Sequence, residues 1–145
     1  MNEQYETPEG FLKHAREFLA VAKLVPNQTE EVSLPLYFLL GRSIELSLKA
    51  YLLACGMAQK ELMSRKFGHN IEALMNEALK RGLENEVSIE SIERGAMQLL
   101  NYDYLSKRLE YRITGGTYHL PFIDVTEQVA QKLASGLDGF CLRNR

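Results

Sequence analysis

Cysteine and histidine are scarce in this sequence. Its 145 residues include two cysteines, Cys55 and Cys141, and three histidines, His14, His69 and His119. Two cysteines cannot build a disulfide framework, and neither residue type recurs at the close spacing of zinc ligands. The composition therefore predicts a reduced protein that holds no metal and no cofactor, and a reducing cytoplasm is the expected location.

The sequence also lacks a large excess of positive or negative charge. Lys and Arg total 17 against 19 Asp and Glu, which gives a net charge of −2 and a pI near 5.9. A protein that binds duplex DNA usually has a broad basic surface, so we exclude that class, whereas a small phosphate site remains compatible with the charge. The first ten residues are polar and acidic, which predicts that there is no signal peptide.

The sequence signatures of common enzyme chemistries are also absent. The chain has no glycine-rich phosphate loop, no nucleophile elbow, no carboxylate cluster for a metal, and no repeat or low-complexity tract. A chain of this length is expected to form one domain, residues 1–145, with a proper hydrophobic core. Any chemistry has to depend on a few separate side chains.

One long hydrophobic run is present, but charges interrupt it. Residues 34–55 are apolar nearly all round, yet Arg42, Glu45 and Lys49 lie in the middle, and each is costly in lipid. We therefore expect a central buried helix and no membrane contact. The three charges lie at i, i+3 and i+7 and share one face. Two interpretations stay open: an ion-pair ladder on the solvent side, or a polar stripe that faces a cleft or a partner subunit.

Helical periodicity covers most of the remaining chain and predicts an all-α bundle of five or six helices. Start and stop signals give the expected helices: from Thr7 to before Pro26, from Ser33 to Gly56, over Ile71–Arg81 with Asn70 as its cap, from a Ser88 cap to about Glu110, and from an Asp124–Glu127 capping box through Leu137. Residues 57–66 are expected to be short helical or irregular, 118–125 to be strand-like but too short for a sheet, and 138–145 to fray.

Arg112 and His119 form the main candidate site. They are separated by six residues and flank a Gly115-Gly116 turn that follows a long helical stretch. Histidine can move a proton near neutral pH, and arginine can hold a phosphate and stabilise the charge that builds on it. Together they are the minimum equipment for cleaving RNA without a metal. The alternative is an ordinary loop arginine and a structural histidine.

Other candidate residues lie close to helix ends. His69 directly precedes an expected helix start, which suits anions, although a capping or packing role is the alternative. The tyrosines at positions 102, 104, 111 and 118 could stack on bases and bind phosphates, or could be half-buried in a core or a dimer interface. We expect Tyr104 to be buried, and both interpretations stay open for Tyr111 and Tyr118.

Taken in order, these pieces resemble the HEPN superfamily of small helical domains. The resembling residues are Glu45–Leu52 (ELSLKAYL), Gly68–Ile71 followed by Leu74, and the Arg112…His119 pair, spread over about residues 10–140. The Arg-x6-His spacing falls inside the family's Arg-x4–6-His range. The resemblance implies a bundle of four to five main helices, a short irregular Arg…His loop before the last helix, and a homodimer.

The resemblance also implies an activity, metal-independent endoribonuclease, with the site in a cleft where two subunits meet. His119 would be the general acid/base acting on the RNA 2′-hydroxyl or the leaving 5′-oxygen. Arg112 would hold the scissile phosphate and stabilise its transition state, and the products would be a 2′,3′-cyclic phosphate and a 5′-hydroxyl. The residues expected to support the site or contact the substrate are Glu45, Lys49, Tyr111 and Tyr118.

One position departs from the family pattern. Active members usually carry a polar residue directly after the arginine, where this sequence has Ile113. Two functions are therefore predicted side by side. The first is a ribonuclease, such as the toxin component of a toxin–antitoxin or defence system. The second is a non-catalytic RNA-binding or protein-interaction module that partners a nucleotidyltransferase or an antitoxin, in which Glu45 and Lys49 would lie at the interface.

Overall fold

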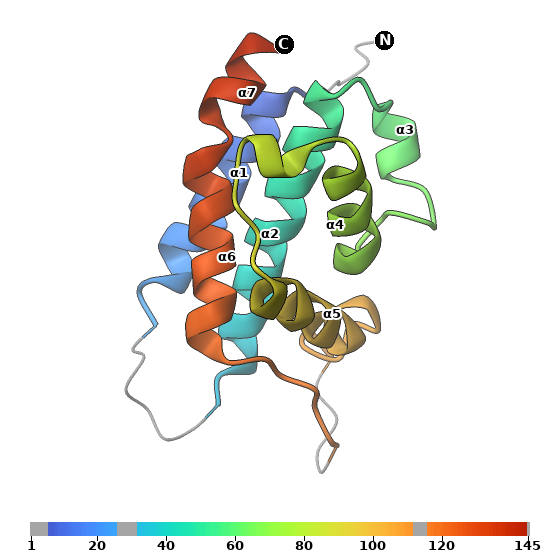
Figure 1. Cartoon of the computed structure of the whole chain (residues 1–145). Helices are drawn as coiled ribbons and strands as arrows, with labels where there is room; N and C mark the ends of the chain where they lie inside the picture. The colour runs from blue at the N-terminus through green and yellow to red at the C-terminus, as the bar shows by residue number, and fades with distance from the viewer. Residues whose placement is uncertain (1–5, 26–31, 112–115, 145) are drawn as a thin grey trace, which may run out of the picture.

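Helices make up the regular structure of the part of the chain that can be described. The computed structural model describes residues 6–25, 32–111 and 116–144 (Figure 1). The elements in chain order are α1 (Pro8–Ala22), α2 (Leu34–Ala54), α3 (Gln59–Leu62), α4 (Ile71–Lys80), the 3₁₀ helix η1 (Leu83–Asn85), α5 (Ser91–Leu105), α6 (Ile123–Gly136) and α7 (Asp138–Arg143). The predicted all-α bundle is confirmed, while membership of the HEPN superfamily stays a prediction.

Helix α2 is the centre of the fold because it is apolar on nearly every side. Leu40, Ile44 and Leu48 are fully buried, and α2 contacts every other α-helix in the described residues. Ser33 begins the helix by accepting the N–H of Leu36 at 3.3 Å. The predicted central buried helix is confirmed. Within the described ranges, no helix has both the length and the apolar character needed to cross a membrane.

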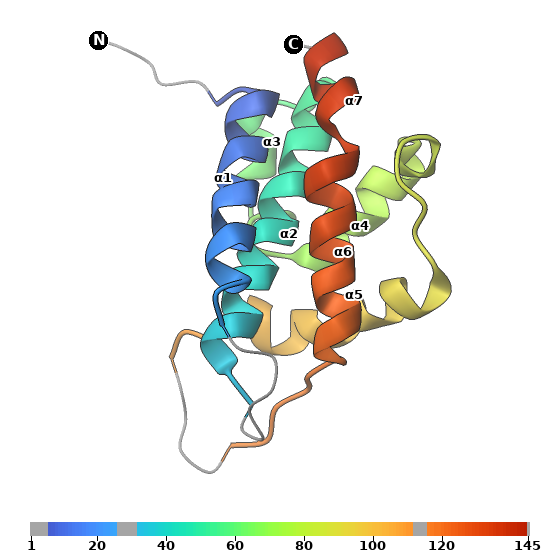
Figure 2. The same ribbon diagram turned by 90° about the vertical axis from the view of Figure 1, so that its left-hand side faces the viewer.

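Helices α1 and α6 lie along α2, α1 running opposite to it and α6 in the same direction (Figures 1 and 2). The Ser43 hydroxyl of α2 donates to the carbonyl of Ala15 on α1 at 2.7 Å, which satisfies a buried polar group between the two helices. Arg16 of α1 donates to the carbonyl of Ala134 at 3.0 Å and also bonds Asp138. These bonds attach α1 to the α6–α7 end of the chain.

Helix α5 runs across α2 instead of along it, and α4 contacts both α2 and α5 (Figure 2). Asn70 caps α4 as predicted, accepting the N–H of Ala73 at 3.0 Å. Asn101 of α5 accepts the N–H of Ile71 at 2.9 Å and donates to the Asn70 side chain at 3.0 Å. The start of α4 is thereby fixed on α5, and this places His69, the residue before the cap, beside α2.

Helix α5 is shorter than the predicted 88–110. It begins with a capping box in which Glu93 accepts the N–H of Glu90 at 2.8 Å, so the predicted Ser88 cap is wrong. At the other end, Lys107 has φ 63, a left-handed conformation that an α-helix cannot continue through. The chain leaves the helix there, about one turn earlier than the periodicity indicated.

The C-terminal part also corrects two predictions. The hydroxyl of Thr126 donates to the carbonyl of Phe122 at 3.0 Å in the first turn of α6, and α6 has no side-chain cap, so the predicted Asp124–Glu127 capping box is wrong. Residues 138–145 were expected to fray, but 138–143 form α7, with Cys141 buried against the core. A helix this short is marginal on its own, and the packing of the buried Cys141 side chain stabilises it.

The close approach of α5 to α2 requires glycine at position 41. A Cβ on Gly41 would lie 2.5 Å from Cδ1 and 2.6 Å from Cε1 of the Tyr104 ring, which is itself buried. Gly95, on the outer side of α5, differs in that a Cβ there would meet no atom within 4 Å. Both glycines lie within helices, so comparing an alanine substitution at each position separates the effect of packing from that of helix propensity.

Gly41→Ala should lower the free energy of unfolding by about 1–3 kcal/mol, because the Tyr104 ring has no space to move into. The matched variant Gly95→Ala should raise it by about 0.5–1 kcal/mol, because alanine is the better helix former. Urea denaturation followed by circular dichroism measures both. A destabilising Gly95→Ala together with a neutral Gly41→Ala would contradict this account of the α2–α5 contact.

Candidate functional site

The structure describes only one member of the predicted Arg–His pair, His119. Arg112 lies outside the described residues, as do Ile113 and Gly115. His119 lies in the connection 116–122, which has no regular structure and leads directly into α6, so the strand-like interpretation of 118–125 is wrong. Tyr37 of α2 donates to the carbonyl of Pro121 at 2.6 Å, which holds this connection against the bundle.

His119 is held by α5 and presents a half-exposed ring. Its backbone N–H donates to Oδ2 of Asp103, and its Nδ1 lies 4.0 Å from the same oxygen. The imidazole stacks on the ring of Tyr102 with 5.0 Å between centroids. The His119 side chain is 49% exposed, so a substrate can reach it from solvent. These are the surroundings of an accessible histidine and differ from those of a core histidine.

Asp103 is the buried acid beneath this histidine. Its side chain is only 1% exposed, and its Oδ1 accepts a hydrogen bond from Nη1 of Arg108 at 3.0 Å. The same guanidinium lies 4.8 Å from the centre of the Tyr118 ring. Of the two tyrosines predicted to contact substrate, Tyr118 is therefore partly buried against Arg108, whereas Tyr111 is largely exposed.

A second polar cluster surrounds the carboxylate of Glu45 on α2. Oε1 accepts the Tyr104 hydroxyl at 2.6 Å and Nδ1 of His69 at 2.9 Å. Oε2 accepts Nζ of Lys49 at 2.9 Å and Nη1 of Arg42 at 3.3 Å. The partners come from α2 itself, from the residue before the α4 cap, and from α5. One side chain thus joins three parts of the fold.

The charged stripe on α2 faces inward. Glu45 is 1% exposed and Lys49 3%, so an ion-pair ladder on the solvent side is the wrong interpretation of the 42, 45, 49 spacing. Both residues, together with Arg42, line a pocket of about 300 Å³, which agrees with the alternative of a polar stripe facing a cleft. Burial is tolerated because Tyr104 and His69 add hydrogen bonds to the ion pair.

The electrostatic surroundings keep Glu45 ionised. Burial by itself would raise the pKa of the Glu45 carboxyl, but Lys49, the bonds from Tyr104 and His69, and Arg42 together outweigh it and lower the pKa. The effect on the partner has the opposite direction: burial and the neighbouring carboxylate raise the pKa of Tyr104 far above its usual range. Tyr104 therefore stays a neutral hydroxyl that donates to a charged acceptor.

His69 has neither the capping role nor the packing role that the sequence offered as alternatives to anion binding. The cap of α4 is Asn70, and the His69 side chain is 48% exposed, so it neither caps nor fills the core. Because an ionised Glu45 can only accept, the bond assigns the shared proton to Nδ1 of His69, and Nη1 of Arg42 lies 3.3 Å from the same nitrogen. A buried carboxylate that orients an accessible imidazole is an arrangement suited to proton transfer.

The sequence analysis missed Asp103 as the partner of His119 and Tyr104 as a partner of Glu45. A signal for Asp103 existed, since it lies three residues after Leu100 and seven after Ala96, on the stripe that α5 buries. A carboxylate on a buried stripe needs a partner. The identity of that partner could not be found by periodicity, because His119 is 16 residues away along the chain.

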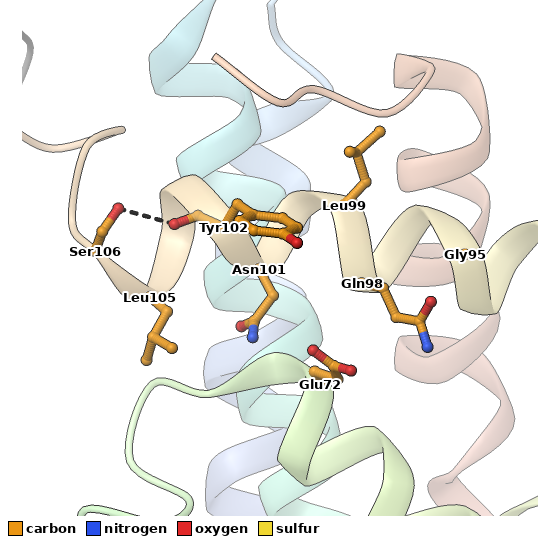
Figure 3. A pocket seen from close by; sticks show the side chains of 8 residues that line it. All are labelled: Glu72, Gly95, Gln98, Leu99, Asn101, Tyr102, Leu105 and Ser106. Carbon is orange, nitrogen blue, oxygen red and sulfur yellow. Dashed lines mark hydrogen bonds between the residues drawn. The ribbon is translucent and has the colours of Figure 1, made fainter. Parts of the chain in front are cut away.

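The outer side of α5 forms a shallow apolar surface beside the start of α4. Figure 3 shows Leu99, Tyr102 and Leu105 of α5 around a pocket of about 660 Å³, with Glu72 of α4 at its edge. Ile92 and these three residues are exposed large hydrophobic side chains. We call this set, Ile92, Leu99, Tyr102 and Leu105, the α5 surface. It joins the His119 site because Tyr102 belongs to both.

Glu45→Gln should lower the free energy of unfolding at pH 7 by about 3–5 kcal/mol, because Lys49 would stay buried without a counter-charge. The double variant Glu45→Gln/Lys49→Met should recover much of this loss, since an apolar chain of similar length replaces the cation. Chemical denaturation measures all three proteins. The matched control is Glu77→Gln, which removes an exposed pair with Arg81 and should cost less than about 1 kcal/mol.

Acid should remove the same contribution from the wild type. Because folding lowers the pKa of Glu45, its charge stabilises the protein above the ordinary glutamate pKa of about 4.3, and this stabilisation is lost as the pH falls through the lowered folded value. The difference in unfolding free energy between wild type and Glu45→Gln should therefore shrink below about pH 4. A difference that stays constant from pH 7 to pH 3 would contradict the assignment of the charge to Glu45.

Comparisons of this chain with models of known families, with curated proteins and with solved structures find no match. Its function therefore has to be inferred from its own residues and their geometry.

Proposed function

We propose that this chain is a HEPN-like domain that cleaves RNA without a metal, as a toxin or defence ribonuclease does. The observation that carries the proposal is the surroundings of His119: a half-exposed imidazole, attached through its backbone to a buried carboxylate and stacked on an exposed tyrosine. Acid–base catalysis needs a histidine that is both positioned and accessible, and His119 meets both conditions.

In the proposed reaction His119 takes the proton of the RNA 2′-hydroxyl or gives one to the leaving 5′-oxygen. The 2′-oxygen attacks the adjacent phosphorus, the bond to the 5′-oxygen breaks, and the products are a 2′,3′-cyclic phosphate and a 5′-hydroxyl. Arg112 has the role of holding the phosphate and offsetting the charge of the transition state. Asp103 is a positioning residue, because its carboxylate holds the His119 backbone and lies 4.0 Å from the ring nitrogen Nδ1.

The tyrosines and the Glu45 cluster have supporting roles in this proposal. Tyr102 already stacks on a planar ring and Tyr111 is largely exposed, so each can stack on a base of single-stranded RNA. Glu45 and Lys49 are too deeply buried to contact an RNA chain. They support the site indirectly, because Glu45 bonds Tyr104, the neighbour of Asp103 on α5.

We also propose that two copies associate through the α5 surface. Its apolar residues recur at positions 92, 99, 102 and 105, so they lie on one side of the helix. The edge of the surface carries an acidic residue, Glu72, and Arg94 lies one turn before Gln98 of the same pocket, so opposite charges can meet across a twofold axis. Because Tyr102 belongs to this surface, such a dimer would bring two His119 sites together.

The same surface supports the second candidate, a non-catalytic module. An exposed apolar helix face fits a protein partner such as a nucleotidyltransferase or an antitoxin as well as it fits a second copy. Ile113, in the place of a polar residue, favours this alternative. The two candidates differ in one measurable property, because only the first requires His119 for a chemical reaction.

The purified protein should cleave a mixed single-stranded RNA pool in the presence of EDTA, and His119→Ala and Arg112→Ala should each reduce the rate by at least about 100-fold. The matched control is His14→Ala, because His14 is an exposed histidine on α1 whose partner is Glu17. It should retain full activity. End-group analysis of the fragments should find cyclic phosphates.

Two results would contradict the ribonuclease proposal. One is loss of cleavage on adding EDTA, which would require a metal. The other is absence of cleavage by folded, dimeric wild-type protein on every RNA tested, which would leave the interaction module as the function. Circular dichroism on each variant separates a loss of activity from a loss of folding.

Leu99→Glu should convert a dimer to a monomer, because it places a charge in the centre of the α5 surface. The control Val21→Glu introduces the same charge at an exposed hydrophobic position of α1 and should leave the mass unchanged. Sedimentation equilibrium measures the mass of both. If the wild-type protein remains monomeric at high concentration, the dimer proposal is wrong, and the α5 surface would instead bind a different protein.

A further inference from the structure

The pocket beside Glu45 has the composition of a small-molecule site. It lies between α1, α2 and the segment before α4, and its volume of about 300 Å³ is at the lower end of the range for ligand pockets. Phe11, Phe18 and Leu46 give it an apolar wall. Arg42, Lys49 and His69 also line it. Its lining does not include His119 or Tyr102, so it is a different site from the proposed ribonuclease centre.

The polar side of the pocket has more hydrogen-bond donors than the Glu45 carboxylate can accept. Each oxygen of Glu45 already accepts two donors, so the carboxylate is fully occupied. Lys49 has three N–H groups and Arg42 has five, and only part of each set reaches Glu45. The remaining donors of Lys49 and Arg42 are available to a ligand with acceptor atoms, and Nε2 of His69 becomes a further donor when the imidazole is protonated.

The charges of the pocket favour a negative ligand. Arg42 and Lys49 contribute two positive charges against one negative charge on Glu45, which leaves the inner pocket at +1 before either His69 or His14 is protonated. Glu6 also borders the pocket, but it is exposed, so water and salt screen its charge. A cation would meet Lys49 and Arg42, which makes a cationic ligand unfavourable.

The arginine is already positioned for binding. Its guanidinium carbon lies 5.6 Å from the centre of the Phe18 ring, and Nη1 bonds Glu45, so ring and carboxylate fix it from two sides. A side chain held in this way loses little further freedom when it binds, which increases affinity. Lys49, being 3% exposed, is likewise desolvated before a ligand arrives.

We propose that this pocket binds a small organic oxyanion, a phosphate monoester or a carboxylate, with its charged end on Arg42, Lys49 and His69 and its apolar or aromatic end against Phe11, Phe18 and Leu46. Phosphate and carboxylate share the chemistry that these residues recognise, namely clustered oxygen acceptors bearing negative charge. The apolar wall adds the requirement for a hydrophobic substituent, which selects against inorganic ions.

The test uses two pairs of probes on the full chain, without RNA: acetate with benzoate, and inorganic phosphate with phenyl phosphate. Binding is followed by isothermal titration calorimetry and by the ring resonances of His69 in NMR spectra. We expect the phenyl compound of at least one pair to bind at least about tenfold more tightly than its parent ion, and to shift the His69 resonances. The pair that responds shows whether the pocket prefers a carboxylate or a phosphate monoester.

Arg42→Gln should weaken binding by about tenfold or more, since a charged donor is lost. His69→Asn is the second variant, because it removes the imidazole from a half-exposed position at the pocket. The control Arg143→Gln removes an exposed arginine of α7 that contacts Glu86, and should bind as the wild type does. The assay is independent of RNA cleavage, so its result is separate from that of the ribonuclease test.

Either of two results would overturn the proposal. No calorimetric or NMR response to any probe at millimolar concentration would make the Glu45 cluster a purely structural network. Equal binding by wild type, Arg42→Gln and His69→Asn would place the anion elsewhere on the protein.

Discussion

The fold depends on one buried carboxylate. Glu45 lies in the middle of the most apolar helix, where an unpaired charge would cost several kcal/mol. Four donors offset this cost, and two of them come from outside α2: His69 before α4 and Tyr104 on α5. The charge can therefore be buried only if α4 and α5 take their observed positions. The interaction adds specificity, since hydrophobic contacts alone would allow these helices to slide.

Three consecutive residues of α5 project in different directions and make different contacts. Tyr104 points inward to Glu45, Asp103 holds the backbone of His119, and Tyr102 is exposed and stacks on the His119 ring. Successive residues of a helix project about 100° apart, so one turn contacts the core, the loop and the solvent-facing surface. Fixing Tyr104 against Glu45 and Gly41 sets the rotation of α5 about its axis. That rotation determines where His119 is held.

The sequence predicted the elements better than the contacts between them. The starts of α1, α2 and α4 follow from local chemistry, since Thr7, Ser33 and Asn70 each cap the turn that follows. Local rules failed where several residues compete for one end, as at 88–93, where Glu90 caps α5. They also failed for the pairs of Glu45 with His69 and Tyr104, separated by 24 and 59 residues. Such pairs depend on helix packing, which periodicity does not encode.

His69 and His119 differ in how a buried carboxylate holds them, and this difference determines what each can do. Glu45 bonds the ring of His69 directly, which fixes its tautomer and its orientation. Asp103 bonds the backbone of His119, and its carboxylate lies 4.0 Å from the ring nitrogen Nδ1, which is longer than a hydrogen bond. A fixed ring suits a small ligand in a preformed pocket. In the proposed ribonuclease, such a ring nitrogen is available for proton transfer with the RNA 2′-hydroxyl or the leaving 5′-oxygen.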